Sequence, residues 1–216
     1  SDAVHRELVA LQERTGVHPV EFVLTSEVYG HAMSPDDGLR RACRDMYRQA
    51  ADVCGELGLV TEIEYEYRSQ DPMPLFDPYQ QLSPQEEERF LAFYLELLGR
   101  VEGTSAGVLL EPLNRYESRY LNSVDDNLRL VERVAHPNAG LLPDTFHMSI
   151  EESSIPDALR RAGGQVKHVH LGENNRLLPG HGSLDWPAIF DALREIGFEG
   201  SVNLECSTTG DPAQTL

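Results

Sequence analysis

The chain has 216 residues, of which 40% are hydrophobic, which is enough for one sizeable core. Its 18 Lys and Arg residues against 36 Asp and Glu residues give a formal net charge of −18, and this sign of charge repels a phosphate backbone, so we expect no nucleic-acid partner. No apolar run reaches the roughly 18 residues of a membrane span, and no basic-then-apolar leader opens the chain, so we expect neither membrane association nor export.

The three cysteines, Cys43, Cys54 and Cys206, are odd in number and show no CxxC spacing. They therefore predict neither a disulfide framework nor a zinc ribbon. We expect a reducing, cytoplasmic location.

Short β-rich runs and longer helical segments alternate along the chain. The β-rich runs lie at 19–24, 59–67, 106–111, 139–144, 165–171 and 201–205, and the helical segments lie near 3–15, 36–57, 84–102, 123–135, 155–162 and 186–196. The helix near 84–102 has clear start signals, because Ser83 can cap it and Pro84 occupies its first turn. Alternation of this kind predicts parallel strands joined by helical crossovers.

Two arrangements fit this pattern: an open doubly wound sheet and a closed eightfold barrel. No GxGxxG motif or P-loop follows any β-rich run, so the commonest nucleotide sites of open sheets are absent. No linker divides the chain, and we expect a single domain over residues 1–216. In the run 61–67, Glu62, Glu64 and Glu66 alternate onto one face, which is either wet or directed into a barrel lumen.

Four successive β-rich runs end on, or carry near their end, a side chain that can bind a metal. These are Glu111, Asp144, His170 (with His168 two residues before it) and Glu205. The carboxyl ends of the strands meet at one face of a (β/α) barrel, so we expect the four to converge there. Three carboxylates and one imidazole suit a divalent ion with a preference for oxygen, namely Mn²⁺, Mg²⁺ or Co²⁺. Taken singly, each residue also has a plain structural interpretation, as a strand-end acid in water or a hydrogen-bonded core histidine.

Further polar residues follow these ends. Glu117 lies six residues after Glu111, His147 lies one helical turn after Asp144, and Arg176 lies in the loop after His170. Each has an alternative interpretation: Glu117 as a surface acid, His147 as a helix cap, and Arg176 as a loop cation paired with Glu173.

Four stretches, LEPLNRYE, LPDTFHMSIEE, HVHLGENNRLLPGHGSLDW and NLEC, closely resemble the sugar isomerase/epimerase superfamily of xylose-isomerase-like barrels. Within that superfamily the chain is most similar to the ketose 3-epimerase group, which includes tagatose and allulose epimerases. The resemblance is specific from Glu111 to Glu205 and looser over 36–84. It implies an α/β fold, the TIM (β/α)8 barrel. Residues 1–15 would be its second helix, and the first two strands, the first helix and the last helix would lie outside this chain, leaving the barrel incomplete at both ends.

The resemblance also implies an activity and its residues. The chain would epimerise a ketose at C3 through a cis-enediolate stabilised by one divalent ion, Mn²⁺, Co²⁺ or Mg²⁺. It implies metal ligands at Glu111, Asp144, His170 and Glu205, acid–base catalysis by Glu111 and Glu205 on opposite faces of the sugar, and substrate binding by Glu117, His147 and Arg176. It further implies a small-molecule sugar as partner and a homodimer or homotetramer.

Other functions use the same kind of pocket. An aldose–ketose or hydroxypyruvate-type isomerase and a polyol dehydratase would share the metal and its carboxylates. A catalytically silent sugar-binding barrel is the non-enzymatic alternative, although binding alone would not require both Glu111 and Glu205. A phosphorylated substrate is disfavoured, because Arg176 is the only obvious cation near these motifs and the chain is strongly acidic.

Overall fold

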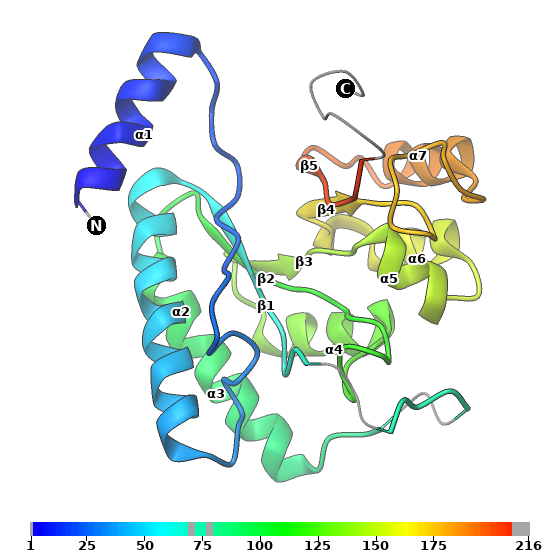
Figure 1. Ribbon diagram of the computed structural model, residues 1–216, viewed down its shortest axis with the longest axis horizontal. Helices are drawn as coiled ribbons and strands as arrows, with labels where there is room; N and C mark the ends of the chain where they lie inside the picture. Colours follow the sequence, from blue (N-terminus) through cyan, green and yellow to red (C-terminus); the bar gives the residue numbers. More distant parts are fainter. Residues whose placement is uncertain (1, 69–71, 77–79, 209–216) are drawn as a thin grey trace.

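The computed structural model describes residues 2–68, 72–76 and 80–208, with side chains from residue 6 onward (Figure 1). The helices are α1 (Asp2–Thr15), α2 (Asp37–Leu57), α3 (Pro84–Val101), α4 (Val124–Val134), α5 (Thr145–Glu151), α6 (Ile155–Ala162), the 3₁₀ turn η1 (Gly163–Gln165) and α7 (Trp186–Glu195). The strands are β1 (Val60–Ile63), β2 (Gly107–Leu110), β3 (Ala139–Leu141), β4 (His168–Leu171) and β5 (Ser201–Leu204). None of the helices in this part of the chain is long and apolar enough to cross a lipid bilayer.

The strands are parallel, as the alternation predicted. β1, β2 and β3 form one three-stranded sheet, and β4 pairs with β5 in a second sheet. Single bridges from Leu141 to Val166 and from Asp144 to His170 connect the two sheets. A bridge from Glu21 to Val60 extends the first sheet at its other edge. The carboxyl ends of β2, β3, β4 and β5 therefore lie along one continuous edge.

Helices pack outside this curved sheet. α2 lies against α3, α4 lies against β3 and α6, and α6 lies against α7 (Figure 1). The interior of this packing is aromatic and aliphatic: Tyr47, Phe90, Phe93 and Tyr94 are fully buried, and every residue of β2 is buried. Their burial supplies the main favourable free energy that holds helices on the sheet.

The sequence signals for α3 are confirmed. The hydroxyl of Ser83 accepts the backbone N–H of Glu86, and the Glu86 carboxylate accepts the backbone N–H of Ser83, which makes a reciprocal capping box. Pro84 then occupies the first turn, where the missing N–H costs nothing.

Several expectations differ from the structure. The run 139–144 is a strand only as far as Leu141, and the run 165–171 only from His168 onward. The run 19–24 forms one bridge at Glu21 instead of a regular strand, and the run 59–67 is regular only as far as Ile63. A short helix, α5, follows β3 where no helix was expected. It forms because the Asp144 side chain caps it, accepting the backbone N–H groups of Phe146 and His147.

Candidate metal centre

The four predicted ligands lie together at the carboxyl edge of the sheet. Glu111 follows β2, Asp144 follows β3, His170 lies in β4 and Glu205 follows β5. Each offers one donor atom, and these four atoms all lie within 4.8 Å of one another. Asp144, His170 and Glu111 are buried, whereas the Glu205 side chain is 45% exposed. The structure thus brings together the residues that the strand-end pattern singled out.

Two atoms of this cluster are buried without a hydrogen-bond partner among the described residues: Glu111 Oε1 and His170 Nδ1. His170 Nδ1 lies 3.7 Å from Glu111 Oε1 and 2.7 Å from Glu205 Oε2, the latter without hydrogen-bond alignment. Buried polar atoms are normally satisfied, so a donor pair left open in this way fits a bound cation. Carboxylate oxygens with one imidazole nitrogen are a donor set suited to an oxygen-preferring divalent ion.

Asp144 and Glu205 both accept hydrogen bonds from one arginine, Arg176. Arg176 Nη1 donates to Asp144 Oδ2 at 2.6 Å, and Arg176 Nη2 donates to Glu205 Oε1 at 2.5 Å. Burial raises the pKa of Asp144 to about 7 despite this partner. Burial also acts to raise the pKa of Glu205, but the adjacent His170 and Asp144 side chains and the charge of Arg176 lower it to about 2.

Arg176 is held in an unusual backbone conformation. Its φ of 62° lies in the left-handed region, which side-chain-bearing residues rarely adopt, and its carbonyl accepts the backbone N–H of Ser207 at 2.7 Å. Its guanidinium lies 4.5 Å from the centre of the Phe146 ring. The sequence suggested Arg176 as a sugar-binding residue, and the structure places it on two of the candidate metal ligands.

His147 and Glu117 are linked through a third residue, Asn114, that the sequence pattern did not single out. The Asn114 backbone N–H and side-chain amide donate to His147 Nδ1 at 3.2 and 2.7 Å, and the same amide donates to Glu117 Oε1 at 3.0 Å. With Nδ1 accepting, the proton lies on His147 Nε2, which is 3.8 Å from Glu111 Oε1. Burial and the nearby Arg176 lower the pKa of His147 to about 3. His147 is therefore neutral.

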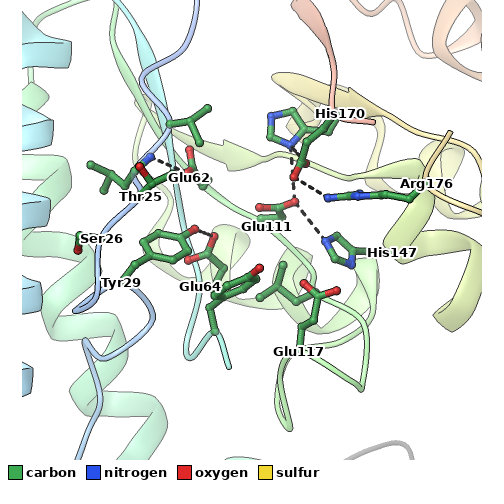
Figure 2. Close-up of a pocket in the computed structure, with 15 residues that line it drawn as sticks. Thr25, Ser26, Tyr29, Glu62, Glu64, Glu111, Glu117, His147, His170 and Arg176 are labelled. Carbon is green, nitrogen blue, oxygen red and sulfur yellow. Dashed lines mark hydrogen bonds and ion pairs between the residues drawn. The ribbon is translucent and has the colours of Figure 1, made fainter. Parts of the chain in front are cut away.

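A pocket of about 250 Å³ opens beside the cluster. Figure 2 shows Glu111, His147, His170 and Arg176 on one side of it and a second group of side chains facing them. The facing group comes from β1, the residue after it and the segment before α2, and consists of Thr25, Ser26, Tyr29, Glu62 and Glu64.

This facing wall explains two of the three alternating glutamates of the sequence, whereas the third, Glu66, accepts the backbone N–H of Arg119. Glu62 and Glu64 are buried and line the pocket, which is the lumen alternative. Glu64 accepts the hydroxyls of Tyr29 and Tyr47, while Glu62 accepts the backbone N–H of Leu24 at 3.2 Å and keeps its other oxygen without a hydrogen-bond partner in the described chain. Burial raises the pKa of Glu62 to about 8 and that of Glu64 to about 7.

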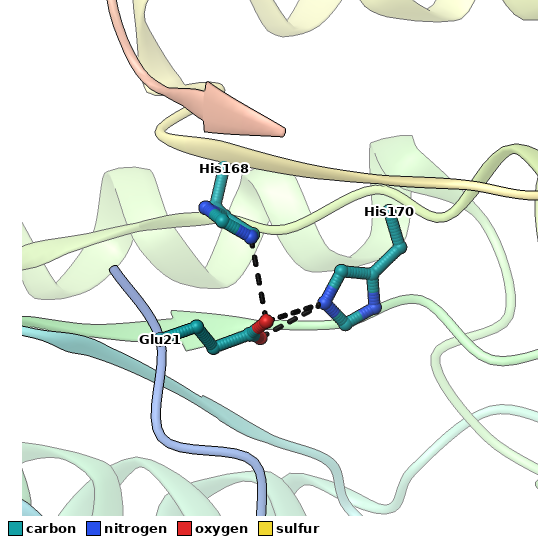
Figure 3. Close-up of side chains that lie close together, drawn as sticks. All are labelled: Glu21, His168 and His170. Atoms are coloured by element: carbon teal, nitrogen blue, oxygen red, sulfur yellow. Dashed lines mark hydrogen bonds and ion pairs between the residues drawn. The ribbon is translucent and has the colours of Figure 1, made fainter. Parts of the chain in front are cut away.

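Sequence reasoning also missed Glu21. Its carboxylate meets the imidazoles of His168 and His170 from the opposite edge of the sheet (Figure 3). Burial acts to raise the pKa of Glu21, but the two adjacent histidines lower it to about 2, so it is ionised. The only signal in the sequence was the His-x-His spacing, which places both rings on one face of β4.

Known proteins resemble the chain in sequence. A 31% identical ketose 3-epimerase of Arthrobacter globiformis aligns over 187 residues, which are 85% of this chain and 62% of that protein. A D-psicose 3-epimerase of Ruminiclostridium cellulolyticum is 41% identical over 118 residues, covering 55% of this chain and 40% of that protein. The chain thus spans less than two thirds of the length of these curated relatives.

Solved structures give the same picture. A 3-keto-D-glucoside 4-epimerase from E. coli matches with a TM-score of 0.81 and 25% identity, covering 95% of this chain and 78% of that one. A D-psicose 3-epimerase with D-tagatose from Clostridium cellulolyticum H10 matches with a TM-score of 0.78 and 28% identity, covering 100% of this chain and 74% of that one. Both the expected TIM barrel fold and the resemblance found in the sequence are confirmed. The sequence model of the xylose isomerase-like TIM barrel family matches residues 1–216, and the chain belongs to that family.

Proposed function

We propose that the protein carrying this chain is a divalent-metal-dependent sugar epimerase that inverts C3 of an unphosphorylated ketose. The observation that carries the proposal is the convergence of Glu111, Asp144, His170 and Glu205 within 4.8 Å, beside a pocket large enough to hold a small ligand. The relatives named as ketose and psicose 3-epimerases support the same assignment.

The ion would be Mn²⁺, Co²⁺ or Mg²⁺, held by Glu111, Asp144, His170 and Glu205. When bound, it would supply positive charge to the carbonyl and hydroxyl oxygens beside the reacting carbon and so favour removal of the C3 proton. Two donor atoms of the centre, Glu111 Oε1 and His170 Nδ1, are buried without a hydrogen-bond partner in the described chain, which supports a bound ion.

Inversion needs one group to take a proton from one face of the sugar and another to return a proton to the opposite face. Glu111 and Glu205 suit these two roles because they reach the centre from β2 and β5, with β3 and β4 between them. Which of the two removes the proton depends on the epimer that enters.

The remaining polar residues would bind the sugar. His147, neutral and protonated on Nε2, donates a hydrogen bond into the pocket, and Glu117 orients it through Asn114. Arg176 keeps Asp144 and Glu205 in place and lies at the pocket wall, where a substrate oxygen can reach it. Its pairing with two carboxylates leaves little positive charge for a phosphate, which favours an unphosphorylated substrate. The homodimer or homotetramer expected from the resemblance stays a prediction.

A second candidate is epimerisation at C4 of a 3-keto sugar. It is favoured by the TM-score of 0.81 to a 3-keto-D-glucoside 4-epimerase and by 37% identity over 112 residues to a 3-dehydro-D-guloside 4-epimerase of Escherichia coli. The chemistry is the same, because C4 is then the carbon next to the ketone.

Isotope exchange in D₂O distinguishes these candidates. We expect the full-length protein loaded with Mn²⁺ to place deuterium at C3 of a 2-ketose, read by proton NMR and mass spectrometry. Deuterium at C4 of a 3-keto-glucoside would favour the second candidate. Deuterium at C1 or C2 with aldose formation would favour an aldose–ketose isomerase instead.

A Glu205→Gln variant tests the catalytic assignment. We expect exchange to fall by about 10²- to 10⁴-fold, the usual contribution of a general acid–base group. The matched control is Glu152→Gln, an acid on the helical layer whose side chain is 7% exposed and which accepts the backbone N–H of Val124. Near-normal exchange in a folded Glu205→Gln protein would contradict the assignment.

A further inference from the structure

We propose that Glu21 is a positioning residue for the metal centre: its carboxylate fixes the ring of His170 so that Nδ1 faces the other three ligands. The inference rests on the proposed function, because it gives Glu21 a role only where His170 binds the ion. No motif of the sequence points to Glu21, which lies 149 residues before His170.

His170 lies between carboxylates on both sides of its ring. Its Nε2 is 2.9 Å from both oxygens of Glu21, while its Nδ1 is 2.7 Å from Glu205 Oε2 and 3.7 Å from Glu111 Oε1 (Figure 3). The two nitrogens of an imidazole point away from one another across the ring. Glu21 is therefore on the side of His170 that faces away from the centre.

This arrangement selects one form of the histidine. An imidazole that binds a metal offers a lone pair from one nitrogen and keeps its proton on the other. A carboxylate that accepts this second N–H fixes the ring orientation and makes the metal-bound nitrogen more basic. Glu21 meets Nε2 with two oxygens, so the proton stays on Nε2 and the lone pair of Nδ1 faces Glu111 and Glu205.

Glu21 is itself held firmly. Asn203 Nδ2 donates to Glu21 Oε2, and His168 Nε2 lies 3.4 Å from the same oxygen without hydrogen-bond alignment. Asn203 is the β5 partner of His170 in the ladder, and His168 lies two residues before His170 on the same face of β4. The Glu21 side chain is 1% exposed, so water does not compete for these contacts.

The backbone contacts of residues 19–24 hold Glu21 in this position. Residues 19–24 make only one bridge to β1, and that bridge is at Glu21. The backbone N–H of Phe22 donates to Val60 O at 2.8 Å and the backbone N–H of Val60 donates to Val20 O at 3.0 Å, which anchors the chain on both sides of Glu21. The sheet edge thus delivers one carboxylate to His170 from across the interior.

The test is Mn²⁺ affinity of the full-length protein, measured by isothermal titration calorimetry on the wild type and on Glu21→Ala and Glu21→Gln variants. We expect one ion per chain in all three. Glu21→Ala should bind Mn²⁺ about 10- to 100-fold more weakly, the usual loss when the outer partner of a metal-binding histidine is removed. Glu21→Gln should lose less, because its amide oxygen can still accept the Nε2–H of His170.

A second readout follows the ring itself. With Mg²⁺ bound, long-range ¹H–¹⁵N NMR spectra should show His170 protonated at Nε2 in the wild type. In Glu21→Ala we expect a mixture of the two neutral forms or a shifted ring. A residue that only supports packing would leave this signature unchanged. Glu152→Gln is the matched control and should keep wild-type affinity, because Glu152 touches the helical layer instead of the centre.

The outcomes separate the two proposals. If the wild-type protein binds no divalent ion, the proposed function itself is contradicted. A folded Glu21→Ala protein with wild-type Mn²⁺ affinity and an unchanged His170 signature would overturn only the role of Glu21. Two ions per wild-type chain, with one lost on removal of Glu21, would also overturn it, because Glu21 and His168 would then be ligands. If Glu21→Ala does not fold, Glu21→Gln decides, since wild-type affinity and an unchanged ring signature there would equally reject the inference.

Discussion

Acidic residues are handled in opposite ways by the outer helices and by the interior of the sheet. On the helical layer, neighbouring helices are linked by exposed ion pairs: Arg48–Glu96, Arg100–Asp52, Arg129–Glu87, Arg160–Glu195 and Arg161–Asp125. In the interior, carboxylates crowd together with one arginine, Arg176, bonded to two of them. The interior acids are Glu21, Glu62, Glu64, Glu111 and Asp144, and the 45% exposed Glu205, the second partner of Arg176, lies beside them.

The difference shows where function has been placed. Exposed pairs on the helices are screened by water and contribute little to stability, so they are tolerant positions. Buried acids raise the free energy of the folded chain unless something compensates them, and such clusters of perturbed groups mark functional sites.

Asp144→Asn should separate the two tasks of Asp144. Asparagine caps helices as well as aspartate does, so α5 should survive. The ligand charge is lost, and we expect Mn²⁺ affinity to fall by more than about 100-fold, beyond the range for losing an outer partner of a ligand. Calorimetry measures the affinity and circular dichroism checks the fold. Wild-type Mn²⁺ affinity in the variant would contradict the assignment of Asp144 as a metal ligand.

Tyr47→Phe removes a hydroxyl that donates to buried Glu64 at 3.0 Å. At pH 8 we expect the free energy of unfolding of the metal-free protein to fall by about 1.5–3 kcal/mol, the range for a hydrogen bond to a charged group. The matched control is Tyr94→Phe, whose buried hydroxyl donates to the neutral carbonyl of Val108 at 2.8 Å and should cost about 0.5–1.5 kcal/mol. Urea unfolding measures both, and an equal loss would mean that Glu64 carries no charge.

The stability of the metal-free protein should fall as the pH rises from about 6.5 to 8. Burial raises the pKa of Glu62 to about 8 and that of Asp144 to about 7, so in this window the folded state holds protons that the unfolded state has already released. Glu64, whose pKa burial raises to about 7, acts in the same direction, so the unfolding free energy decreases as the pH rises through this window. His147, with its pKa lowered to about 3, acts in the opposite direction only below about pH 6.5.

Glu62→Gln supplies the control for this pH dependence. Glutamine at position 62 does not titrate, so the decline between pH 6.5 and 8 should become shallower while the site residues stay in place. Urea unfolding at four pH values within this window would measure the slope. An unchanged slope would show that Glu62 is ionised throughout, in conflict with its burial.

Arg160→Ala tests the outer layer. Arg160 is 40% exposed and pairs with Asp157 and Glu195 on the helical surface. We expect a change below about 1 kcal/mol in the unfolding free energy and none in Mn²⁺ affinity. A loss as large as that of Tyr47→Phe would remove the contrast between the two regions.

Much of the fold could be predicted from local patterns. Ser83 and Pro84 predicted the start of α3, and the strand–helix alternation predicted parallel strands. Both signals are visible in the sequence because caps and periodicity depend on neighbouring residues. Strand boundaries were less well predicted. Residues 19–24 read as a strand but form only one bridge, since pairing depends on the neighbouring chain and leaves no mark on the run itself.

The site divides in the same way. Glu111, Asp144, His170 and Glu205 could be predicted to converge because parallel strands share one carboxyl edge. The contacts of Glu21 with His170, and of Tyr47 with Glu64, join residues that are distant in the sequence or on different elements. Nothing local distinguishes these partners from ordinary surface residues, and only the folded chain shows them.

Anomalous diffraction at the manganese edge tests the central claim most directly. Crystals of the full-length protein grown with Mn²⁺ should show one strong peak within about 2.5 Å of a donor atom from each of Glu111, Asp144, His170 and Glu205, the usual range of bonds to divalent ions. A peak that lies elsewhere in the molecule, or none at saturating Mn²⁺, would contradict the four-residue centre.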